Sequence, residues 1–411
     1  MLQATYWELI EALSYCRPKW VVVDAYMLEK NIHYLDDREE YADEEEINTS
    51  VDQLHLNMDA WPLDKLKIAA IDDLIKDEGV KKEFLFDFIV YHNRWEYLNE
   101  SDYRAITGNG EKNQLFGAEM RYEVELNSPE YPEPSEESLL TEHTVGAEYL
   151  MKIIDECQRD GIGVVVTFYP FAAETKDKAS AIRAGEIAAM YDVPYVNMLD
   201  MDVIDVYSDL NDRGHLNVTG SKKVTDYMGQ WLMETGDLVD HRGDSSYSHY
   251  EENAEEFKDE LLDVLLEEDD LFVKLNILSM DDYSFVLYCN EGSLVFDDSS
   301  FKHLVKKITG TDEIDITKGP YILIKDAGTG SVYEARDGES LGSIPTSLGT
   351  LNYQPVEKMF RFLYPGEDES VNYLYDDEHL EEDIQLIIYD KETGEILSHD
   401  YFRSNGGNYE R

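Results

Sequence analysis

The first 235 residues alternate between amphipathic helical segments and short, uninterrupted apolar runs. The runs Trp20-Val-Val-Val-Asp24-Ala-Tyr26 and Gly161–Phe168 lack polar alternation, which is typical of strands buried on both faces of a parallel sheet. A shorter run, Val193–Val196, predicts a third strand. Helices are predicted over Thr5–Ser14, Pro62–Lys76, Lys82–Leu98 (with a strand as the alternative), Glu142–Arg159, Lys178–Tyr191 and Gly220–Met233. This rhythm predicts an α/β domain over residues 1–235, with helices covering a parallel sheet.

The pattern changes after residue 235. Gly236–Asn253 is polar and Glu252–Glu268 is an acidic amphipathic helix, so residues 236–269 are predicted to be a linker and helix. From residue 270 to residue 411, short alternating segments between Gly- and Asp-rich turns predict a β-rich, sandwich-like domain. Its predicted strands are Val273–Leu278, Ser284–Tyr288, Tyr321–Lys325, Ser331–Glu334, Met359–Leu363, Ile384–Tyr389 and Glu395–Phe402.

The charge balance is strongly acidic. The 411 residues include 35 Lys and Arg against 89 Asp and Glu, a formal net charge of −54. Such a surface repels nucleic acid and anionic lipid, so we expect neither as a partner. No apolar run is long enough to span a bilayer, and the first residues lack the pattern of a secretion signal.

Cysteine and histidine spacing indicates neither a disulfide framework nor a metal site. Cys16, Cys157 and Cys289 are far apart and odd in number. Cys157 falls on the apolar side of a predicted helix, where it is expected to be a small buried hydrophobe. The histidines show no HxxxH or HExxH spacing, so neither a metal ion nor another cofactor is predicted.

The segment that indicates chemistry is Asp209-Leu-Asn-Asp212-Arg-Gly-His215-Leu-Asn217-Val-Thr-Gly220. A histidine acts as a general base when a carboxylate bonded to its far ring nitrogen fixes its tautomer. Asp212, three residues before His215 in a tight loop, is predicted to have this role, with Asp209 as the rival. The alternative is a surface or helix-capping histidine.

No serine in the sequence has the surroundings of a nucleophile. A Gly-x-Ser-x-Gly motif is absent, and Gly243-Asp244-Ser245 lies in the polar linker without a strand before it, so we do not interpret Ser245 as the nucleophile. The overlapping Arg242-Gly-Asp244 has no supporting context either. Ser208 and Ser221 are near the histidine in sequence, and Ser221 is better explained as part of a helix cap.

A second polar cluster, Tyr91-His92-Asn-Arg94-Trp95, follows a very apolar segment. His92 and Arg94 are candidate substrate-binding residues, because an arginine beside a histidine can bind a sugar oxygen or a carboxylate. The equally good alternative places both at a solvated helix end with Trp95 packed inward.

Together these residues resemble a known family. Asp212-Arg-Gly-His215-Leu-Asn217-x-x-Gly220, followed by an apolar helix, resembles the last conserved block of SGNH/GDSL-type hydrolases, in particular the membrane-anchored DltD/AlgJ/AlgX-like type of Gram-positive gut bacteria. The resemblance extends over residues 1 to about 250. Its other segments are Tyr6-Trp7-x-Leu9-x-Glu11-Ala12-Leu13, Pro18–Asp24, Trp61-Pro-Leu, Tyr91–Trp95 and Asp240-His-Arg-Gly-Asp244-x-x-Tyr247.

The resemblance implies a flavodoxin-like three-layer α/β/α sandwich outside the cytoplasm or at the cell surface. It also implies hydrolysis or transfer of an ester-linked acyl group, often acetyl on a polysaccharide. In such a reaction serine attacks the ester carbonyl, histidine removes its proton and aspartate orients the histidine. The implied partners are therefore a carbohydrate or a small acyl ester.

The chain departs from the family pattern at its start. In the family, the serine and the oxyanion glycine precede the helix that here begins near Thr5, and Asp24 occupies the region of an asparagine block whose Gly-x-Asn-Asp pattern is absent. We expect a truncated N-terminus, because a sheet without its first strand would leave an unpaired apolar edge. A degenerate, non-catalytic member is the alternative. The chain as given is then expected to be inactive, with membrane association only through a missing N-terminal anchor.

The C-terminal region has a fainter resemblance. Gly319-Pro-Tyr-Ile-Leu-Ile-Lys-Asp326, Val332-Tyr-Glu334 and Asp383–Asp390 with the following Thr-Gly394 resemble the β-sandwich of the interleukin-like EMT inducer family. Two hypotheses follow. The first is an SGNH-like esterase, deacetylase or O-acyltransferase acting on a cell-surface polysaccharide, without its nucleophilic serine. The second is a non-catalytic cell-surface protein that binds glycan.

Overall fold

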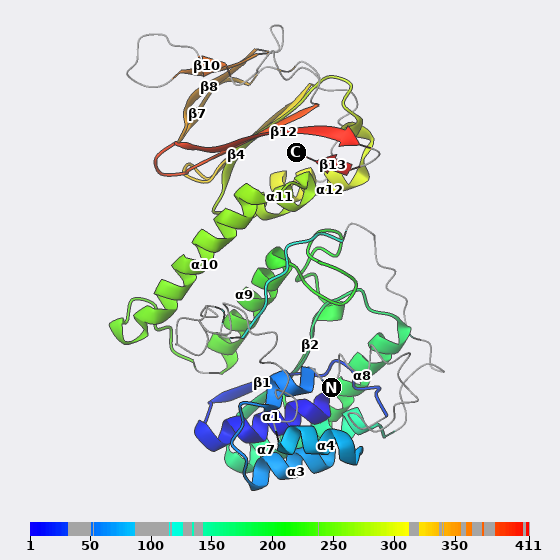
Figure 1. Cartoon of the computed structure of the whole chain (residues 1–411). Coiled ribbons are helices and arrows are strands. Elements are labelled where there is room, and N and C mark those ends of the chain that lie inside the picture. The colour runs from blue at the N-terminus through cyan, green and yellow to red at the C-terminus, as the bar shows by residue number, and fades with distance from the viewer. Residues whose placement is uncertain are drawn as a thin grey trace. The chain divides into compact units, whose positions relative to one another are not determined.

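The chain forms two compact units in a computed structural model (Figure 1). The first unit contains Met1–Asn113, Glu130–Ile204 and Asp226–Asp240, and the second contains Gln114–Pro129, Asp205–Thr225 and His241–Arg411. The structure describes residues 1–31, 51, 53–86, 115, 117–125, 134, 143–236, 238–311, 320–336, 339, 341–354, 359–363, 372–373, 383–405 and 408–410.

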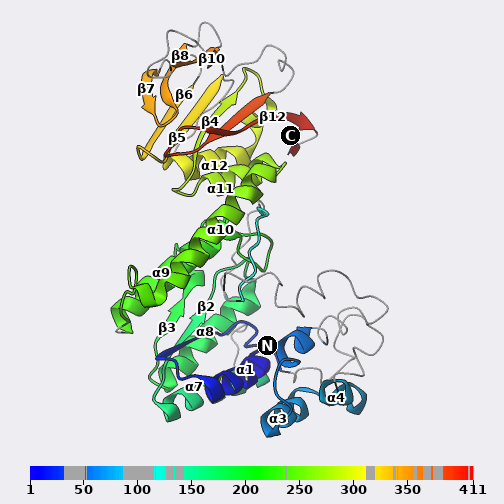
Figure 2. The ribbon, with the colours of Figure 1, turned by 60° about the vertical axis from the view of Figure 1, so that its left-hand side comes forward.

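The first unit is built on a three-stranded parallel sheet with the strand order β1-β2-β3. Strands β2 and β3 are labelled in Figure 2. Its described elements are α1 (Leu2–Tyr15), β1 (Trp20–Asp24), α3 (Lys65–Leu74), α4 (Glu78–Leu85), α7 (Val145–Asp160), β2 (Gly163–Phe168), α8 (Thr175–Met190), β3 (Tyr195–Asn197) and the 3-10 turn η4 (Met198–Asp200). Helix α9 (Val218–Thr235) begins in the second unit and ends in the first.

Alternation along β2 explains how the helices cover this sheet. Val164, Val166 and Phe168 point to one face and pack with buried residues of α1, α7 and α8. Val165 points to the other face and is also fully buried. On that face Trp20 contacts Trp231 of α9 edge to face. Burial on both faces is why the strand has an apolar sequence without polar alternation.

The helix boundaries follow from local chemistry. Thr144 caps α7 by accepting the N–H of Ala147 at 3.0 Å, and Gly161 ends the helix in a left-handed conformation with φ 69°. Glu174 and Asp177 form a reciprocal capping box at the start of α8. The predicted helices at Thr5–Ser14 and Glu142–Arg159 are thus confirmed, with ends that shift by a few residues.

The second unit is built on antiparallel sheets. One has six strands in the order β13-β12-β11-β4-β5-β6, and the other has four in the order β10-β9-β8-β7. The strands are β4 (Ser284–Cys289), β5 (Tyr321–Asp326), β6 (Ser331–Arg336), β7 (Gly342–Thr346), β8 (Gly349–Gln354), β9 (Met359–Leu363), β10 (Asn372–Tyr373), β11 (Ile384–Tyr389), β12 (Ile396–Asn405) and β13 (Asn408–Glu410). The helical elements are η5 (Ser245–Tyr247), α10 (Ser248–Glu267), α11 (Leu271–Leu278), η6 (Leu294–Asp297) and α12 (Ser299–Thr309).

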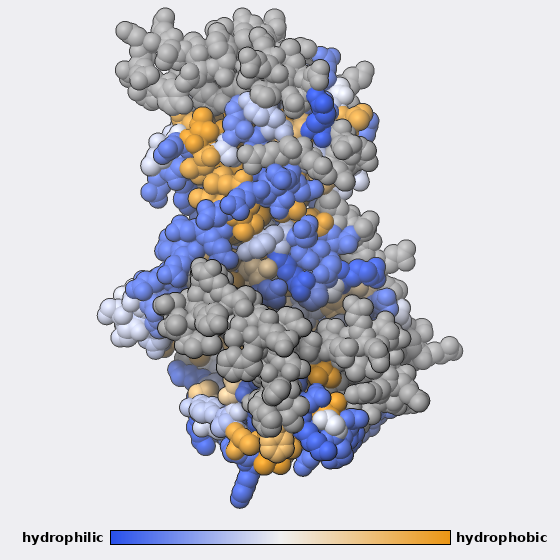
Figure 3. Space-filling view, in the orientation of Figure 1, coloured by the Kyte–Doolittle hydropathy of each residue, from blue (hydrophilic) through white to orange (hydrophobic). Residues whose placement is uncertain are grey.

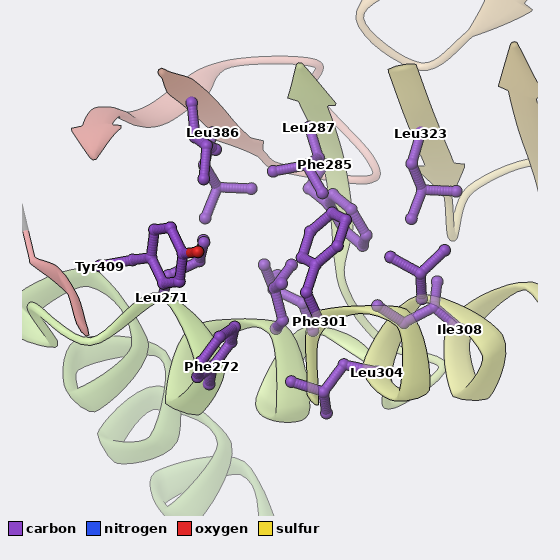
Figure 4. Close-up of a cluster of buried hydrophobic side chains, with 14 of the residues drawn as sticks. Leu271, Phe272, Phe285, Leu287, Phe301, Leu304, Ile308, Leu323, Leu386 and Tyr409 are labelled. Atoms are coloured by element: carbon purple, nitrogen blue, oxygen red, sulfur yellow. The ribbon is translucent and has the colours of Figure 1, made fainter. Parts of the chain in front are cut away.

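The six-stranded sheet separates two apolar layers. Phe285, Leu287, Leu323 and Leu386 pack on one face against residues of α11 and α12, as Figure 4 shows. The alternate residues of the same strands face the opposite side, where they pack with residues of β7 and β8. These alternate residues are Val286, Tyr288, Ile322, Ile324, Ile387 and Tyr389. Strands β4, β5 and β11 are thus buried along their whole length, with apolar residues on both faces, and do not show the alternating pattern predicted for them. The reason is that helices cover one face of the sheet and strands cover the other.

The chain is thus a mixed α/β protein with a parallel sheet in one unit and antiparallel sheets in the other, as the pattern predicts at this level. One predicted strand is wrong, because Val273–Leu278 belongs to helix α11. Asp270 caps this helix by accepting the N–H groups of Phe272 and Val273, and all eight helix residues are buried. Periodicity cannot separate a short buried helix from a buried strand.

The division into compact units does not follow the predicted boundary at residue 235. Residues 205–225, which include Asp212 and His215, belong to the second unit. The predicted domains at 1–235, 236–269 and 270–411 remain a prediction.

The surface agrees with the composition. Hydrophilic residues dominate the described surface in the space-filling view, with small apolar patches between them (Figure 3). Within the described residues, no helix combines the length and the apolar character needed to cross a bilayer.

We predict that Phe301→Ala destabilises the second unit by about 3–5 kcal/mol, because the fully buried ring leaves a cavity between α12 and the sheet. Leu294→Ala is the control, since Leu294 is 60% exposed and its loss is expected to change stability by less than about 0.5 kcal/mol. Urea unfolding followed by circular dichroism measures both. Equal midpoints for the two variants would contradict this packing.

Candidate functional site

The segment with the candidate catalytic residues is a tight hairpin ahead of α9. Leu210 and Leu216 form an antiparallel bridge, and the N–H of Asn211 donates to the carbonyl of His215 at 2.9 Å. Below the bridge, the N–H of Asn217 donates to the carbonyl of Asp209 at 3.0 Å. Residues 209–217 are therefore called the histidine hairpin, with residues 212–215 at its tip.

The tip joins Asp212 to His215. Oδ1 of Asp212 accepts the backbone N–H groups of Gly214 at 2.8 Å and of His215 at 3.0 Å. The same carboxylate lies 2.9 Å and 3.0 Å, through Oδ1 and Oδ2, from Nδ1 of His215. The turn thus brings a side chain three residues upstream against the imidazole. Asp212, and not its rival Asp209, is the hydrogen-bond partner of His215.

The electrostatics of the tip keep this carboxylate ionised. Burial alone would raise the pKa of Asp212, but hydrogen bonds from Gly214 and His215 outweigh it and hold the pKa at about 2. Nη1 of Arg121 lies 3.8 Å from Oδ2 of Asp212 and adds a favourable charge. A carboxylate at Nδ1 fixes the proton there and leaves Nε2 of His215 able to accept one.

No nucleophile adjoins this pair among the described residues. Within them, no serine, threonine or cysteine forms a hydrogen bond with the imidazole of His215. Oγ of Ser208 donates to Asp205 at 3.0 Å instead, and Ser221 lies in the first turn of α9. In Gly243-Asp244-Ser245, the Asp244 side chain caps η5 by accepting the N–H of Ser246.

Other candidates stand apart from this pair. The predicted substrate-binding residues His92 and Arg94 lie outside the described residues. Asp24 ends β1 in the first unit, at the carboxyl edge of a parallel sheet where reactive groups of such folds lie. Burial raises the pKa of Asp24 to about 6, although hydrogen bonds from the backbone N–H groups of Tyr169, Tyr26 and Ala25 oppose this effect.

The base of the histidine hairpin is a buried polar network around Asp209. Its side chain is fully buried. Oδ1 accepts from Thr219 and from Lys307, both at 2.7 Å, and Oδ2 accepts from Lys223 at 2.6 Å and from the N–H of Asp205 at 2.7 Å. Burial would raise the pKa of Asp209, but the charges of Lys307 and Lys223 hold it below its usual value. Asp209 is thus a structural carboxylate.

Two further motif residues fix the turn into α9. Nδ2 of Asn217 donates to the carbonyls of Ser208 at 2.8 Å, Leu210 at 3.3 Å and Glu123 at 3.2 Å. A Cβ on Gly220 would lie 2.2 Å from the carbonyl oxygen of Asp209. The motif therefore divides into a base of Asp209, Asn217 and Gly220 and a tip of Asp212 and His215.

Helix α12 supplies partners of Asp205 and Asp209 that the sequence analysis does not predict. Lys307 reaches Asp209, and Nε2 of His303 lies 2.5 Å from Oδ2 of Asp205. The sequence contains a spacing that could have indicated these contacts. His303 and Lys307 are four residues apart, as are Asp205 and Asp209. Two matched i, i+4 pairs of opposite charge can meet between two segments.

The described residues contain no group of three or more histidine, cysteine, aspartate or glutamate side chains arranged to hold a metal ion. Comparison with protein-family models, curated proteins and solved structures finds no match to this chain. The catalytic role of Asp212 and His215 therefore stays a prediction from the motif and its geometry.

We predict that Gly220→Ala destabilises the protein, because the new methyl group must displace the carbonyl of Asp209 at the base of the histidine hairpin. Gly229→Ala, on the same helix, is the control. A Cβ there meets no atom within 4 Å, so it is expected to stabilise α9 by up to about 1 kcal/mol. Thermal unfolding of both variants measures the difference. If both substitutions change the stability in the same direction, the result would contradict the close approach of Gly220 to the carbonyl of Asp209.

We also predict a pH dependence from Asp205. Burial would raise its pKa, but His303 and other hydrogen-bond donors lower it from 3.8 to about 2. Because the folded pKa lies below the unfolded one, the stabilisation is present above pH 4 and is lost as the pH falls through 2. Its size is about 2 kcal/mol.

The measurement compares free energies of unfolding for the wild type and Asp205→Asn at pH 5 and pH 2. The stability difference between the two proteins is expected to shrink at the lower pH. A difference that stays constant across this range would show that Asp205 is not held ionised by its partners.

Proposed function

We propose that Asp212 and His215 are the acid–base pair of an SGNH-type ester hydrolase, deacetylase or O-acyltransferase, whose substrates are acyl esters on a cell-surface polysaccharide. The observation that carries the proposal is the contact of both Asp212 carboxylate oxygens with Nδ1 of His215, at 2.9 Å and 3.0 Å. The motif that forms this contact is the one that resembles the last block of the family.

In this mechanism Nε2 of His215 removes the proton from the attacking hydroxyl and later returns it to the leaving oxygen. Asp212 stabilises the imidazolium that forms between these steps. The side chains of His215 and Asp212 are 56% and 42% exposed, so a polymer can approach the tip. In the family that the motif resembles the attacking hydroxyl belongs to a serine, and among the described residues no serine forms a hydrogen bond with the imidazole of His215.

The finer parts of this proposal rest on the family resemblance. They are the flavodoxin-like three-layer sandwich, the location outside the cytoplasm or at the cell surface, and the carbohydrate or small acyl ester substrate. The chemistry requires no metal ion or cofactor. The net charge of −54 is a further reason to exclude nucleic acid as a substrate.

A second candidate is a non-catalytic protein that binds glycan at the cell surface. The observation in its favour is that the described residues place no hydroxyl or thiol in hydrogen-bond contact with His215. In that case the C-terminal β-rich region would contribute to glycan binding, and Asp212 and His215 would transfer no proton. The two candidates predict different behaviour on an acetylated polysaccharide.

We predict that His215→Ala and Asp212→Asn each lower any ester hydrolysis that the chain supports by about a hundredfold or more, as expected for loss of a general base or of the group that orients it. The assay is acetate release from an acetylated polysaccharide, with p-nitrophenyl acetate as a second substrate. His241→Ala is the matched control, because His241 also has an aspartate three residues away, Asp244, but at 4.0 Å.

Equal losses in His241→Ala and His215→Ala would contradict a specific role for the pair. If the wild-type chain binds the polysaccharide without releasing acetate, and both variants bind equally well, the non-catalytic candidate replaces the first. Activity that persists in Ser245→Ala would show that the serine of Gly243-Asp244-Ser245 is not the nucleophile.

A further inference from the structure

The histidine hairpin is attached at its base to the helical layer of the second unit. Lys307 of α12 donates from Nζ to Oδ1 of Asp209 at 2.7 Å and to Oδ1 of Asn276 on α11 at 2.6 Å. Thr219, at the start of α9, lies between them, 2.7 Å from Asp209 and 3.2 Å from Lys307. Four elements thus meet at one ammonium group.

We propose that Lys307 is a positioning residue for the Asp212–His215 pair, so that α11 and α12 of the second unit form part of the site instead of a separate accessory module. The catalytic meaning of this inference rests on the proposed function. The attachment itself rests on contacts within the second unit alone.

Lys307 is more deeply buried than Lys223, the other lysine that binds Asp209. The Lys307 side chain is 9% exposed, whereas that of Lys223 is 39% exposed. Burial lowers the pKa of Lys307, and the adjacent Asp209 carboxylate opposes that effect. A charge this buried is retained only with a partner of opposite charge, so Lys307 and Asp209 hold each other in place.

The backbone of the histidine hairpin connects the contacts of Asp209 at its base to Asp212 and His215 at its tip. The carbonyl of Asp209 accepts the N–H of Asn217, which closes the base of the histidine hairpin, and Asp212 follows three residues later. On the other side, His303 of α12 binds Asp205. The segment that leads into the hairpin is therefore held at two points, one helical turn apart on α12, which leaves the short tip little freedom.

The test is Lys307→Met, which keeps the aliphatic stem and removes the ammonium group. Asp209 keeps Lys223, Thr219 and the N–H of Asp205, so its charge is not left unpaired. Lys306→Met is the matched control, because Lys306 is the exposed neighbour on the same helix and its loss changes the charge equally. Hydrogen–deuterium exchange of the hairpin amides and the NMR signals of the His215 ring are measured in the full chain.

In Lys307→Met, amide exchange in residues 209–217 is expected to accelerate about tenfold or more, as for the loss of a charged hydrogen bond. The amides of β4 and β11 are expected to exchange at unchanged rates, and the NMR signals of the His215 ring are expected to change as its contact with Asp212 loosens. Lys306→Met is expected to change none of these. Ester hydrolysis is expected to fall about tenfold as the general base loses its alignment.

Unchanged exchange in the hairpin would overturn the inference, whatever the activity. Faster exchange in β4 and β11 as well as the hairpin would also overturn it, because it would show a purely global role. If the hairpin loosens but the wild type has no esterase activity, positioning stands and the proposed function fails. Should Lys307→Met not fold, Thr219→Ala removes the hydroxyl between Asp209 and Lys307 and gives the same comparison.

Discussion

The buried carboxylate of Asp209 is the constraint on which the candidate site depends. An ionised group that is fully withdrawn from water requires opposite charges and hydrogen-bond donors around it, and Asp209 has two lysines, a hydroxyl and a backbone N–H. These partners come from α9, from α12 and from the segment before the hairpin. Satisfying one carboxylate therefore brings three parts of the chain together.

Helix α12 shows how such a network is supported. Its apolar side, which includes Phe301 and Leu304, packs on the six-stranded sheet as part of the core in Figure 4. Its polar side carries His303 and Lys307 to Asp205 and Asp209. The opposite face of the sheet is covered by residues of β7 and β8, so the sheet on which α12 packs is covered on both faces. Rigid packing is what allows a polar contact to position a reactive group.

The motif around His215 combines two physical roles that a sequence pattern presents as one. At the base, Asp209, Asn217 and Gly220 are buried and hold the backbone, with no reacting group among them. At the tip, Asp212 and His215 are half exposed and have the geometry of a proton-transfer pair. Such a pair needs both a hydroxyl to activate and a fixed position relative to it. The second requirement is the one that the buried network can supply.

Much of this protein follows from its sequence alone. The apolar runs that became β1 and β2, the helices between them, and the short apolar segments of β4, β5 and β11 are local patterns, so the sequence identifies them. The sequence does not show that β1 is only partly buried, with Val22 exposed, whereas β4, β5 and β11 are buried throughout. The hydrogen bond between Asp212 and His215 was also predictable, because it closes within three residues. The buried helix α11 was not, since a short apolar run fits a strand equally well.

Only the tertiary structure decided that Asp209 binds Lys223 and Lys307 instead of His215. Those contacts join residues up to 98 positions apart, and desolvation of the carboxylate, which no local pattern encodes, selects them.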